Sequence, residues 1–454
     1  MQICPPHFHR LLAALCLLMT PFAVSRGDLV TDWNNLALTT MRTSTEAPMM
    51  ARDLAILSTS MFNASESIRG TYQTYGFGSY AAPGSGPTGA SYEAAMATAA
   101  NTVMQSLYSG SSTAFTNLYN SQLGAIADGQ AKTDGIAWGT TIANNMLSWR
   151  STDGASVAAI TPYSPVGTVG YWQQTSAAGA MLPGWGTVGT FAIAGTGTYM
   201  SSLTLGSLSS YVQTNQYATD YNQVKDLGSA FSVTRTSDQT NQAYFWTAGA
   251  GTAKMTDMWN KVAQTTAAGA GLSVTDTARL IAAVNTAMAD AGIVAMATSY
   301  DTQFWRPETA IANGDADGNI NTDVDIFWAP LINSPSLPEY VSLGSALSSA
   351  AATVLSHYLG NSVSFSLGSD INGDGSTDLT RNFTSFSQAA NEAALSGIYA
   401  GTQFGTSVTD GQAIGANVAN FVVSNNFAVV PEPSGALLVM VGSSMFLFGT
   451  RRRR

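Results

Sequence analysis

Two acidic segments have the residue types and spacing of a calcium-binding loop. The first reads Asp370-x-Asn372-x-Asp374-Gly375-Ser376-x-Asp378. Side-chain oxygens at alternate positions, with a glycine that allows a sharp turn, are how such a loop surrounds its ion. The twelfth position is Arg381, where a calcium loop has a bidentate carboxylate. Two interpretations follow: a weak calcium site held by Asp370, Asn372, Asp374, Ser376 and Asp378, or an acidic turn that joins helices, which we favour.

A second segment of this kind begins at Asn313. It reads Asn313-x-Asp315-x-Asp317-Gly318-Asn319-x-Asn321, with Val324 at the twelfth position. The same two interpretations apply. A calcium-dependent adhesin is a third function that these segments leave open.

Residues 1–25 have the order of a secretory signal peptide. Arg10 precedes the apolar run 11–19, and the small residues Ala23 and Ser25 stand before the expected cleavage after Ser25. The apolar run is too short for a membrane span, which needs about 20 residues. We therefore expect the protein to be exported.

Histidine and cysteine are scarce once this segment is removed. Both cysteines and two of the three histidines lie within residues 1–25, so His357 is the only histidine left. The remaining chain has no thiol for a disulfide or a metal site. A mechanism that needs two histidines is excluded.

The other end, residues 430–454, has three parts. Val430-Pro431-Glu432-Pro433-Ser434 is followed by the apolar run 435–450 and by four arginines. This order resembles the PEP-CTERM sorting signal of exported bacterial proteins, which implies transient membrane contact and recognition by an exosortase-type sorting machinery. The arginines favour the cytoplasmic side while the apolar run enters the bilayer. A plain C-terminal anchor is the alternative, and either way we expect the protein at the cell surface or outside the cell.

The charge balance excludes a nucleic-acid partner. The chain has 18 basic and 28 acidic residues, a net charge of −10. Without Arg10 and the four terminal arginines, 13 basic residues face 28 acidic ones, which is −15. Neutralising phosphates requires clustered Lys and Arg, which this body lacks.

The body, residues 28–425, is expected to form one compact unit, because it contains no charged or Pro-rich linker. Apolar residues recur with helical spacing along 54–68 and 280–295, and segments 92–107, 135–149 and 345–358 share this pattern. Ser91 and Ser345 are expected N-caps. Stretches rich in Gly, Ser and Pro, at 77–89 and 154–206, predict loops. The fold class is therefore all-α, a helical bundle with long Gly/Ser-rich loops and few strands.

Asp290 interrupts the apolar stripe of the expected helix 278–297. A buried carboxylate needs a partner, for which Arg306 is a candidate, and solvent exposure is the alternative. The tryptophans, including Trp172, Trp185, Trp246 and Trp259, are expected in the core, although a carbohydrate platform is the other use of such rings.

Three segments carry a family resemblance. They are Phe304-Trp305-Arg306-Pro307, then 338–344, and then 383–399. Within 278–404 they resemble motifs of the vanadium haloperoxidase and type 2 phosphatidic acid phosphatase superfamily, and of its exported bacterial branch. Weaker similarity at 51–55, 150–154 and 221–246 extends the resemblance over most of the body. It implies a helical bundle around an oxyanion held by a Lys, two Arg, a Ser and a backbone amide, with two histidines for the chemistry.

In the first motif the family places a Lys seven residues before Arg-Pro, which predicts two cations on one helical face. Here Arg306 is retained, but Ser299 stands in the Lys position. A multiply charged anion needs several charge-assisted partners, so the change removes part of its binding energy.

The second and third motifs have lost their histidines. The resemblance assigns Ser342 to the anion, but Gly344 stands where the acid or base histidine belongs. Gly397 replaces the second Arg, and Gln403 replaces the histidine that would bind vanadium or carry the phosphoryl group. His357 is 13 residues beyond Gly344, about 20 Å along one helix, so it cannot substitute and is expected to be an ordinary surface or packed residue.

Two functions remain open. The first is a non-catalytic binding or extracellular-matrix protein, a pseudoenzyme without a cofactor, whose partner could be an extracellular polysaccharide. The alternative is an active haloperoxidase or acid phosphatase-like enzyme, with vanadate as cofactor for the former, that uses Arg306 and Ser342 in a changed mechanism.

Overall fold

The computed structural model describes residues 28–42, 45–175, 179–203, 207–246 and 254–431. The expected signal peptide and most of the expected sorting tail lie outside these residues. The described part is mostly helical and contains one two-stranded sheet, so the all-α prediction is confirmed. The helices are α1 Leu29–Met41, α2 Ala47–Arg69, α3 Tyr92–Leu107, α4 Ser112–Gly124, α5 Gln130–Arg150, α6 Ala155–Ala158, α7 Leu208–Tyr211, α8 Asn215–Gly228, α9 Ser237–Trp246, α10 Met255–Gly269, α11 Val274–Thr302, α12 Pro307–Ala312, α13 Leu343–Leu359, α14 Phe386–Tyr399 and α15 Gly405–Asn425, with short 3-10 turns at Ser109–Ser111 and Trp185–Thr187.

The longest helix, α11, is the axis of the molecule. The hydroxyl of Ser273 caps its first turn by accepting from the Asp276 N–H at 3.2 Å, and Gln303 ends it in the left-handed conformation with φ 58°. By length and composition α11 could cross a membrane, but 94% of its most apolar window is buried inside the protein. It is therefore a core helix, packed against α2, α10, α13 and α15.

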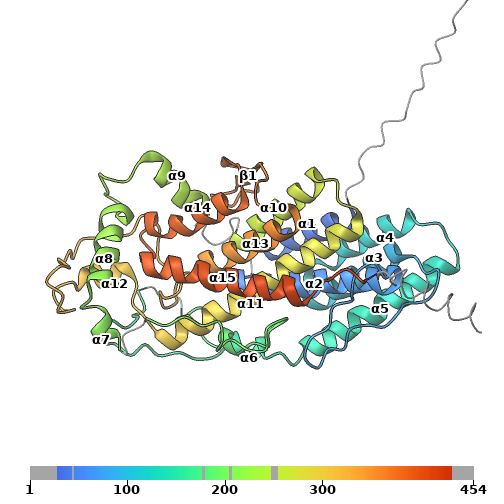
Figure 1. Ribbon diagram of the computed structural model, residues 1–454, viewed down its shortest axis with the longest axis horizontal. Coiled ribbons are helices and arrows are strands. Elements are labelled where there is room, and N and C mark those ends of the chain that lie inside the picture. Colours follow the sequence, from blue (N-terminus) through green and yellow to red (C-terminus); the bar gives the residue numbers. More distant parts are fainter. Residues whose placement is uncertain (1–27, 43–44, 176–178, 204–206, 247–253, 432–454) are drawn as a thin grey trace, which may run out of the picture.

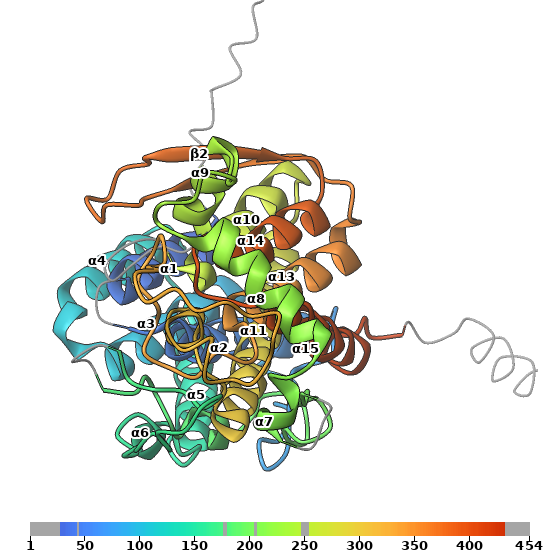
Figure 2. The same ribbon diagram turned by 90° about the vertical axis from the view of Figure 1, so that its left-hand side faces the viewer.

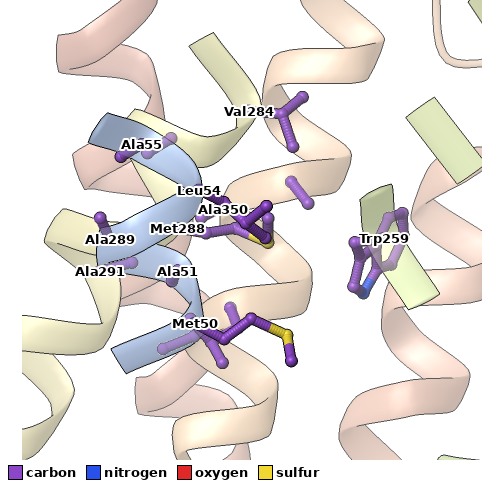
Figure 3. Close-up of a cluster of buried hydrophobic side chains, with 14 of the residues drawn as sticks. Met50, Ala51, Leu54, Ala55, Trp259, Val284, Met288, Ala289, Ala291 and Ala350 are labelled. Carbon is purple, nitrogen blue, oxygen red and sulfur yellow. The ribbon is translucent and has the colours of Figure 1, made fainter. Parts of the chain in front are cut away.

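Two groups of helices cover α11. Figure 1 shows α1 to α5 at one end of an elongated molecule, with α7, α8 and α12 at the other. Figure 2 shows the sheet and α9 over one side and α6 and α7 on the opposite side. Apolar side chains of α2, α11 and α13, including Leu54, Met288 and Ala350, meet between the groups (Figure 3). One continuous core runs from α1 to the residues after α15.

Glycines let α15 lie directly on the backbone of α13. A Cβ on Gly411 would be 2.5 Å from the Ser342 carbonyl oxygen, and one on Gly415 would be 2.1 Å from the Ala346 carbonyl oxygen. Real side chains cannot approach this closely, so both positions require glycine. This contact fixes the start of α13 against the start of α15, where the expected oxyanion site lies.

The predicted helices form, with one wrong cap. Tyr92–Leu107 is α3 as predicted, and Ser91 caps it through the Ala94 N–H at 3.1 Å. The prediction of Ser345 as an N-cap is wrong, because α13 begins earlier and Ser342 caps it. The Ser342 hydroxyl accepts from the Ser345 N–H at 3.3 Å.

Asp290 is buried, but Arg306 is not its partner. Its carboxylate accepts backbone N–H groups of Phe191, Ala192 and Ile193 at 2.6 to 3.1 Å. Burial raises the pKa of Asp290 to about 6, although these N–H groups oppose the rise. The prediction failed because a loop from the 154–206 stretch turns its backbone into the core.

The tryptophans expected in the core, Trp172, Trp185, Trp246 and Trp259, are buried.

The first acidic segment connects strands, not helices. β1, Phe365–Ser369, pairs antiparallel with β2, Leu379–Phe383, and the acidic residues form the turn between them. Our expectation of a turn is correct, but its placement between helices is wrong. The sequence between these strands is rich in Gly and Asx residues, which favour a hairpin connection.

Candidate functional site

The ends of four helices meet at the expected oxyanion site. Ser299 lies in the last turn of α11, Arg306 immediately precedes α12, Ser342 caps α13, and Gly397 is in α14. Gln403 follows in the short link to α15. Ser299 and Arg306 do not share a helical face as predicted, because α11 ends at Thr302 and a new helix begins at a proline.

Arg306 is bound almost entirely by its own chain. It is 1% exposed, and it donates to the carbonyl oxygens of Leu337 at 2.8 Å, Pro338 at 3.2 Å and Thr402 at 2.9 Å. Burial lowers the pKa of its guanidinium to about 10, and the charge of Glu339 opposes that fall. The group remains a cation at neutral pH, with most of its five N–H donors already used.

Glu339 supplies a buried negative charge beside this cation. Its side chain is fully buried and accepts from the Phe404 N–H at 2.8 Å and the Ser407 hydroxyl at 2.5 Å. Burial raises the pKa of Glu339 to about 7, with the Arg306 charge opposing the rise. No role at the site was expected of Glu339 from the sequence.

Gln403 connects the two charged groups. In the amide orientation that satisfies both neighbours, its nitrogen donates to Glu339 at 2.9 Å and its oxygen accepts from Arg306 Nη1 at 2.6 Å. It is 8% exposed. Gln403, which the family resemblance places where the reactive histidine belongs, is therefore an internal hydrogen-bond bridge.

Gly397, which has no side chain, leaves room for the side chain of Gln403. A Cβ at position 397 would be 2.7 Å from Gln403 Cγ, so a larger residue there would have to displace the glutamine. The Gly397 carbonyl also accepts the Gln403 N–H at 3.1 Å. The space beside α14 that an arginine would need is filled by Gln403.

The remaining site residues serve the local structure. Ser342, besides capping α13, donates its N–H to the Ser407 carbonyl at 3.1 Å, which ties it to the Glu339 network. The hydroxyl of Ser299 is buried and donates to the Val341 carbonyl at 3.4 Å. A Cβ on Gly344 would be 3.3 Å from the end of the Met255 side chain, so this position faces the start of α10.

The comparisons with known proteins concern the fold. The family model described as the VCPO second helical-bundle domain matches residues 279–430. A bacterial vanadium-dependent iodoperoxidase superposes with a TM-score of 0.73 at 22% identity, over 89% of this chain and 97% of that chain. A holo-type bacterial vanadium-dependent chloroperoxidase gives 0.64 at 14% identity over 85% and 93%, and an apo-type gives 0.64 at 14% over 89% and 95%. No curated protein matches by sequence.

The chain has the fold of the vanadium haloperoxidases, and its residues 279–430 match their second helical-bundle domain. The alignments cover nearly the whole of each solved structure, so the likeness extends well beyond the matched C-terminal bundle. Identities this low establish a shared fold and leave the chemistry to the residues of the site itself.

Vanadate does not fit the residues at this site. The only cation there among the described residues is Arg306, whose donors face carbonyl oxygens and Gln403. An added oxyanion would lie beside the Glu339 carboxylate, and two like charges about 4 Å apart repel by about 4 kcal/mol at an effective dielectric constant of 20. Among the described residues the one imidazole is that of His357, which is exposed at the far end of α13, as expected.

The calcium-like segments are held by their own backbone. Asp370 accepts from the Gly373 and Gly375 N–H groups at 2.8 and 2.9 Å and from Arg42 at 3.2 Å. Asp378 accepts from the Ile371 N–H at 2.7 Å. Within the residues that the structure describes, no three His, Cys, Asp or Glu side chains are grouped to hold a metal. Calcium binding stays a prediction, and it would require these carboxylates to turn.

In the second segment, Asp317 and Asn319 are also engaged. Asp317 accepts from the Asn319 N–H at 2.8 Å and from the Thr322 hydroxyl at 2.9 Å. Asn319 donates to the Val212 carbonyl at 2.9 Å, so the segment is bound to the link between α7 and α8. Asp317 and Asn319 are therefore engaged within the protein.

The sequence could have indicated Glu339 as part of the site. A carboxylate within the apolar stretch that precedes a helix needs a partner, and Arg306 is the cation that the resemblance already placed nearby. Ser407 gave no such signal, because a serine in the first turn of a helix is common.

Proposed function

We propose that this protein is an exported, non-catalytic binding or extracellular-matrix protein built on the vanadium haloperoxidase fold. The observation that carries the proposal is Gln403, which occupies the position of the reactive histidine and joins Arg306 to Glu339. A site whose charges are already paired inside the protein has little capacity left for an external anion.

The site also offers no accessible side chain that could act as a general acid, a general base or a nucleophile. General acid–base and nucleophilic steps need a side chain that titrates near neutral pH and reaches the reacting atom. Glu339 has a pKa near 7 but is fully buried and bonded to Phe404, Ser407 and Gln403. It is therefore a structural carboxylate, not an acid or base available to a substrate.

The test is turnover by the purified chain. It is incubated with vanadate, peroxide and bromide or iodide, and separately with a phosphomonoester. We expect no rate above the protein-free reaction in either assay. Turnover that disappears in Arg306→Ala would support the alternative, an enzyme that uses Arg306 and Ser342, and would refute the proposal.

Export and surface sorting are the second part of the proposal. Residues 1–25 would be removed as a signal peptide, and residues 430–454 would contact the membrane transiently before an exosortase-type machinery cuts them. Mass spectrometry of the protein recovered from its host should find a chain that starts at Arg26 and lacks the terminal arginines. An intact chain in the cytoplasm would contradict this part alone.

A further inference from the structure

Two neighbouring surface hollows lie along α15. The first adjoins the site formed by Arg306, Glu339 and Gln403, which we call the filled site, because its lining residues Gly405 and Thr406 stand between the Glu339 partners Phe404 and Ser407 in the sequence. The first, of about 680 Å³, lies between α8, α14 and the first turns of α15, and the second, of about 480 Å³, lies between α13, α14 and α15. Gln412 lines both. We call the two hollows together the α14–α15 groove. In Figure 1 the helices that form it lie side by side in the half of the molecule that holds α8.

The groove extends along most of α15. Its lining on this helix runs from Gly405 in the first hollow to Asn420 in the second, about 22 Å at 1.5 Å per residue. Each hollow is within the range of about 300 to 1,000 Å³ that is usual for small-molecule sites. An extended ligand of several units could therefore occupy both.

The lining of the groove does not favour an anion. Among the described residues that line it, none is a lysine or an arginine, and the first hollow contains the carboxylates Asp220 and Asp410. In the first hollow a phosphate, a uronic acid or an anionic lipid headgroup would meet these negative charges without a lysine or arginine to pair with.

The two carboxylates are already engaged by the protein. Asp220 accepts from the N–H and the hydroxyl of Thr406 at 3.0 and 2.6 Å and from Gln216 at 3.1 Å. Asp410 accepts from the Tyr340 hydroxyl at 2.6 Å. Their charge thus holds α8 and the segment before α13 against α15, and it is less available to a cationic ligand.

Side-chain amides are the groups left without partners. Gln223 of α8, Asn391 of α14 and Gln412 of α15 all line the first hollow, and their side chains make no hydrogen bond to any described residue. An amide both donates and accepts, as a sugar hydroxyl does. Leu395, Ile398 and Val408 add apolar surface between these amides, which suits the C–H faces of a sugar ring.

We propose that the α14–α15 groove binds an extended neutral polysaccharide. Three unpartnered amides from three helices, an apolar strip between them and a second hollow lined by Ser, Thr and Asn match a chain of uncharged sugar units. This inference rests on the proposed binding function and names its ligand class.

The test is calorimetric titration of the purified chain with neutral oligosaccharides of two to six units from the cello-, laminari- and malto-series. We expect at least one series to bind, with an affinity that rises at least about tenfold from two to six units as the second hollow is filled. Trigalacturonate and the glucosamine trimer are the acidic and cationic probes, and we expect both to bind more weakly.

Variants locate the site. Asn391→Ala and Gln223→Ala should each weaken binding by up to about tenfold, because each removes a hydrogen bond to the ligand. Asn417→Ala is the matched control, since Asn417 is exposed on α15 and lines neither hollow. All three side chains are exposed, so the melting temperatures should stay unchanged.

Four results would overturn the inference: no neutral series binds, the six-unit sugar binds no better than the two-unit sugar, a charged probe binds best, or the groove variants leave affinity unchanged. The two proposals fail separately. Turnover with vanadate would refute the proposed function without bearing on saccharide binding by the groove. If the protein shows no turnover and binds no saccharide, only the inference about the groove is refuted.

Discussion

The filled site around Arg306 and the α14–α15 groove differ in how far their polar side chains are hydrogen-bonded within the protein. In the filled site a buried cation, a buried carboxylate and Gln403 bond to one another and to backbone carbonyls. In the groove, amides that belong to three helices have no partner among the described residues. Buried polar groups that satisfy each other specify the fold, whereas accessible unsatisfied groups can bind a ligand. The first region therefore stabilises the protein, and the second has the groups that the proposed ligand needs.

The largest expected effect comes from breaking the filled site at its cation. Arg306→Ala leaves Glu339 buried without its compensating charge, and we expect a loss of about 3 to 5 kcal/mol in the free energy of unfolding, measured by urea denaturation at pH 8. Arg69→Ala, at an exposed arginine, should change it by less than about 1 kcal/mol.

A second variant separates charge from packing. Arg306→Ala combined with Glu339→Gln removes both charges and should recover part of the lost stability. If Arg306→Ala alone were as stable as the unchanged protein, the buried pair would not hold the site together.

The pH dependence of stability is the next largest effect. The pKa of Glu339, about 7, and that of Asp290, about 6, are raised above their unfolded values, so the folded state binds protons more tightly. Their contribution is complete below about pH 4 and is lost as pH rises through 6 and 7. Each group can account for at most about 3 kcal/mol, at 1.36 kcal/mol per pKa unit.

We therefore expect the melting temperature to fall between pH 5 and pH 8. Glu339→Gln should flatten the upper part of this profile, because the remaining decline would come from Asp290. A melting temperature that rises over this range would contradict the assignment of these two carboxylates.

A pair of glutamine substitutions compares the two regions directly. Gln403→Leu removes a bridge between buried charged groups and should cost about 1 to 3 kcal/mol of stability. Gln412→Leu removes an amide without a partner in the described chain and should change stability by less than about 0.5 kcal/mol. Equal effects in thermal denaturation would mean that the two regions do not differ as the contacts indicate.

The smallest effect is expected at the calcium-like hairpin. Its carboxylates already accept backbone N–H groups, as in the filled site, so the apparent melting temperature should be the same with calcium and with a chelator. A rise of several degrees on adding calcium would show that Asp370 and Asp378 turn toward an ion, and would favour the adhesin hypothesis.

The sequence predicted the helices better than it predicted their ends. Periodicity over 92–107 gave α3 correctly, because apolar spacing and the cap at Ser91 agree. The cap of α13 and the break between Ser299 and Arg306 depend on how chain segments meet, since the backbone at Gln303 is left-handed and Pro307 begins a new helix. Local propensity carries no information on such junctions.

The sequence indicated which of the family's site residues are missing, but not which interactions take their place. Counting histidines and reading Gly344, Gly397 and Gln403 against the family motifs identified the missing groups. What replaced them is a long-range pairing, because Glu339 and Gln403 are 64 residues apart and meet only when α13 and α15 pack. The partner of Asp290 was missed for the same reason, since backbone N–H groups have no sequence signature.

Vanadate binding tests the central claim most directly. Crystals of the protein, soaked in vanadate, would show whether Arg306 still bonds to Gln403 or has turned toward an oxyanion. The account predicts an unchanged Arg306–Gln403–Glu339 bridge with no vanadium beside it. Vanadium bound covalently to a protein nitrogen at this site would contradict it.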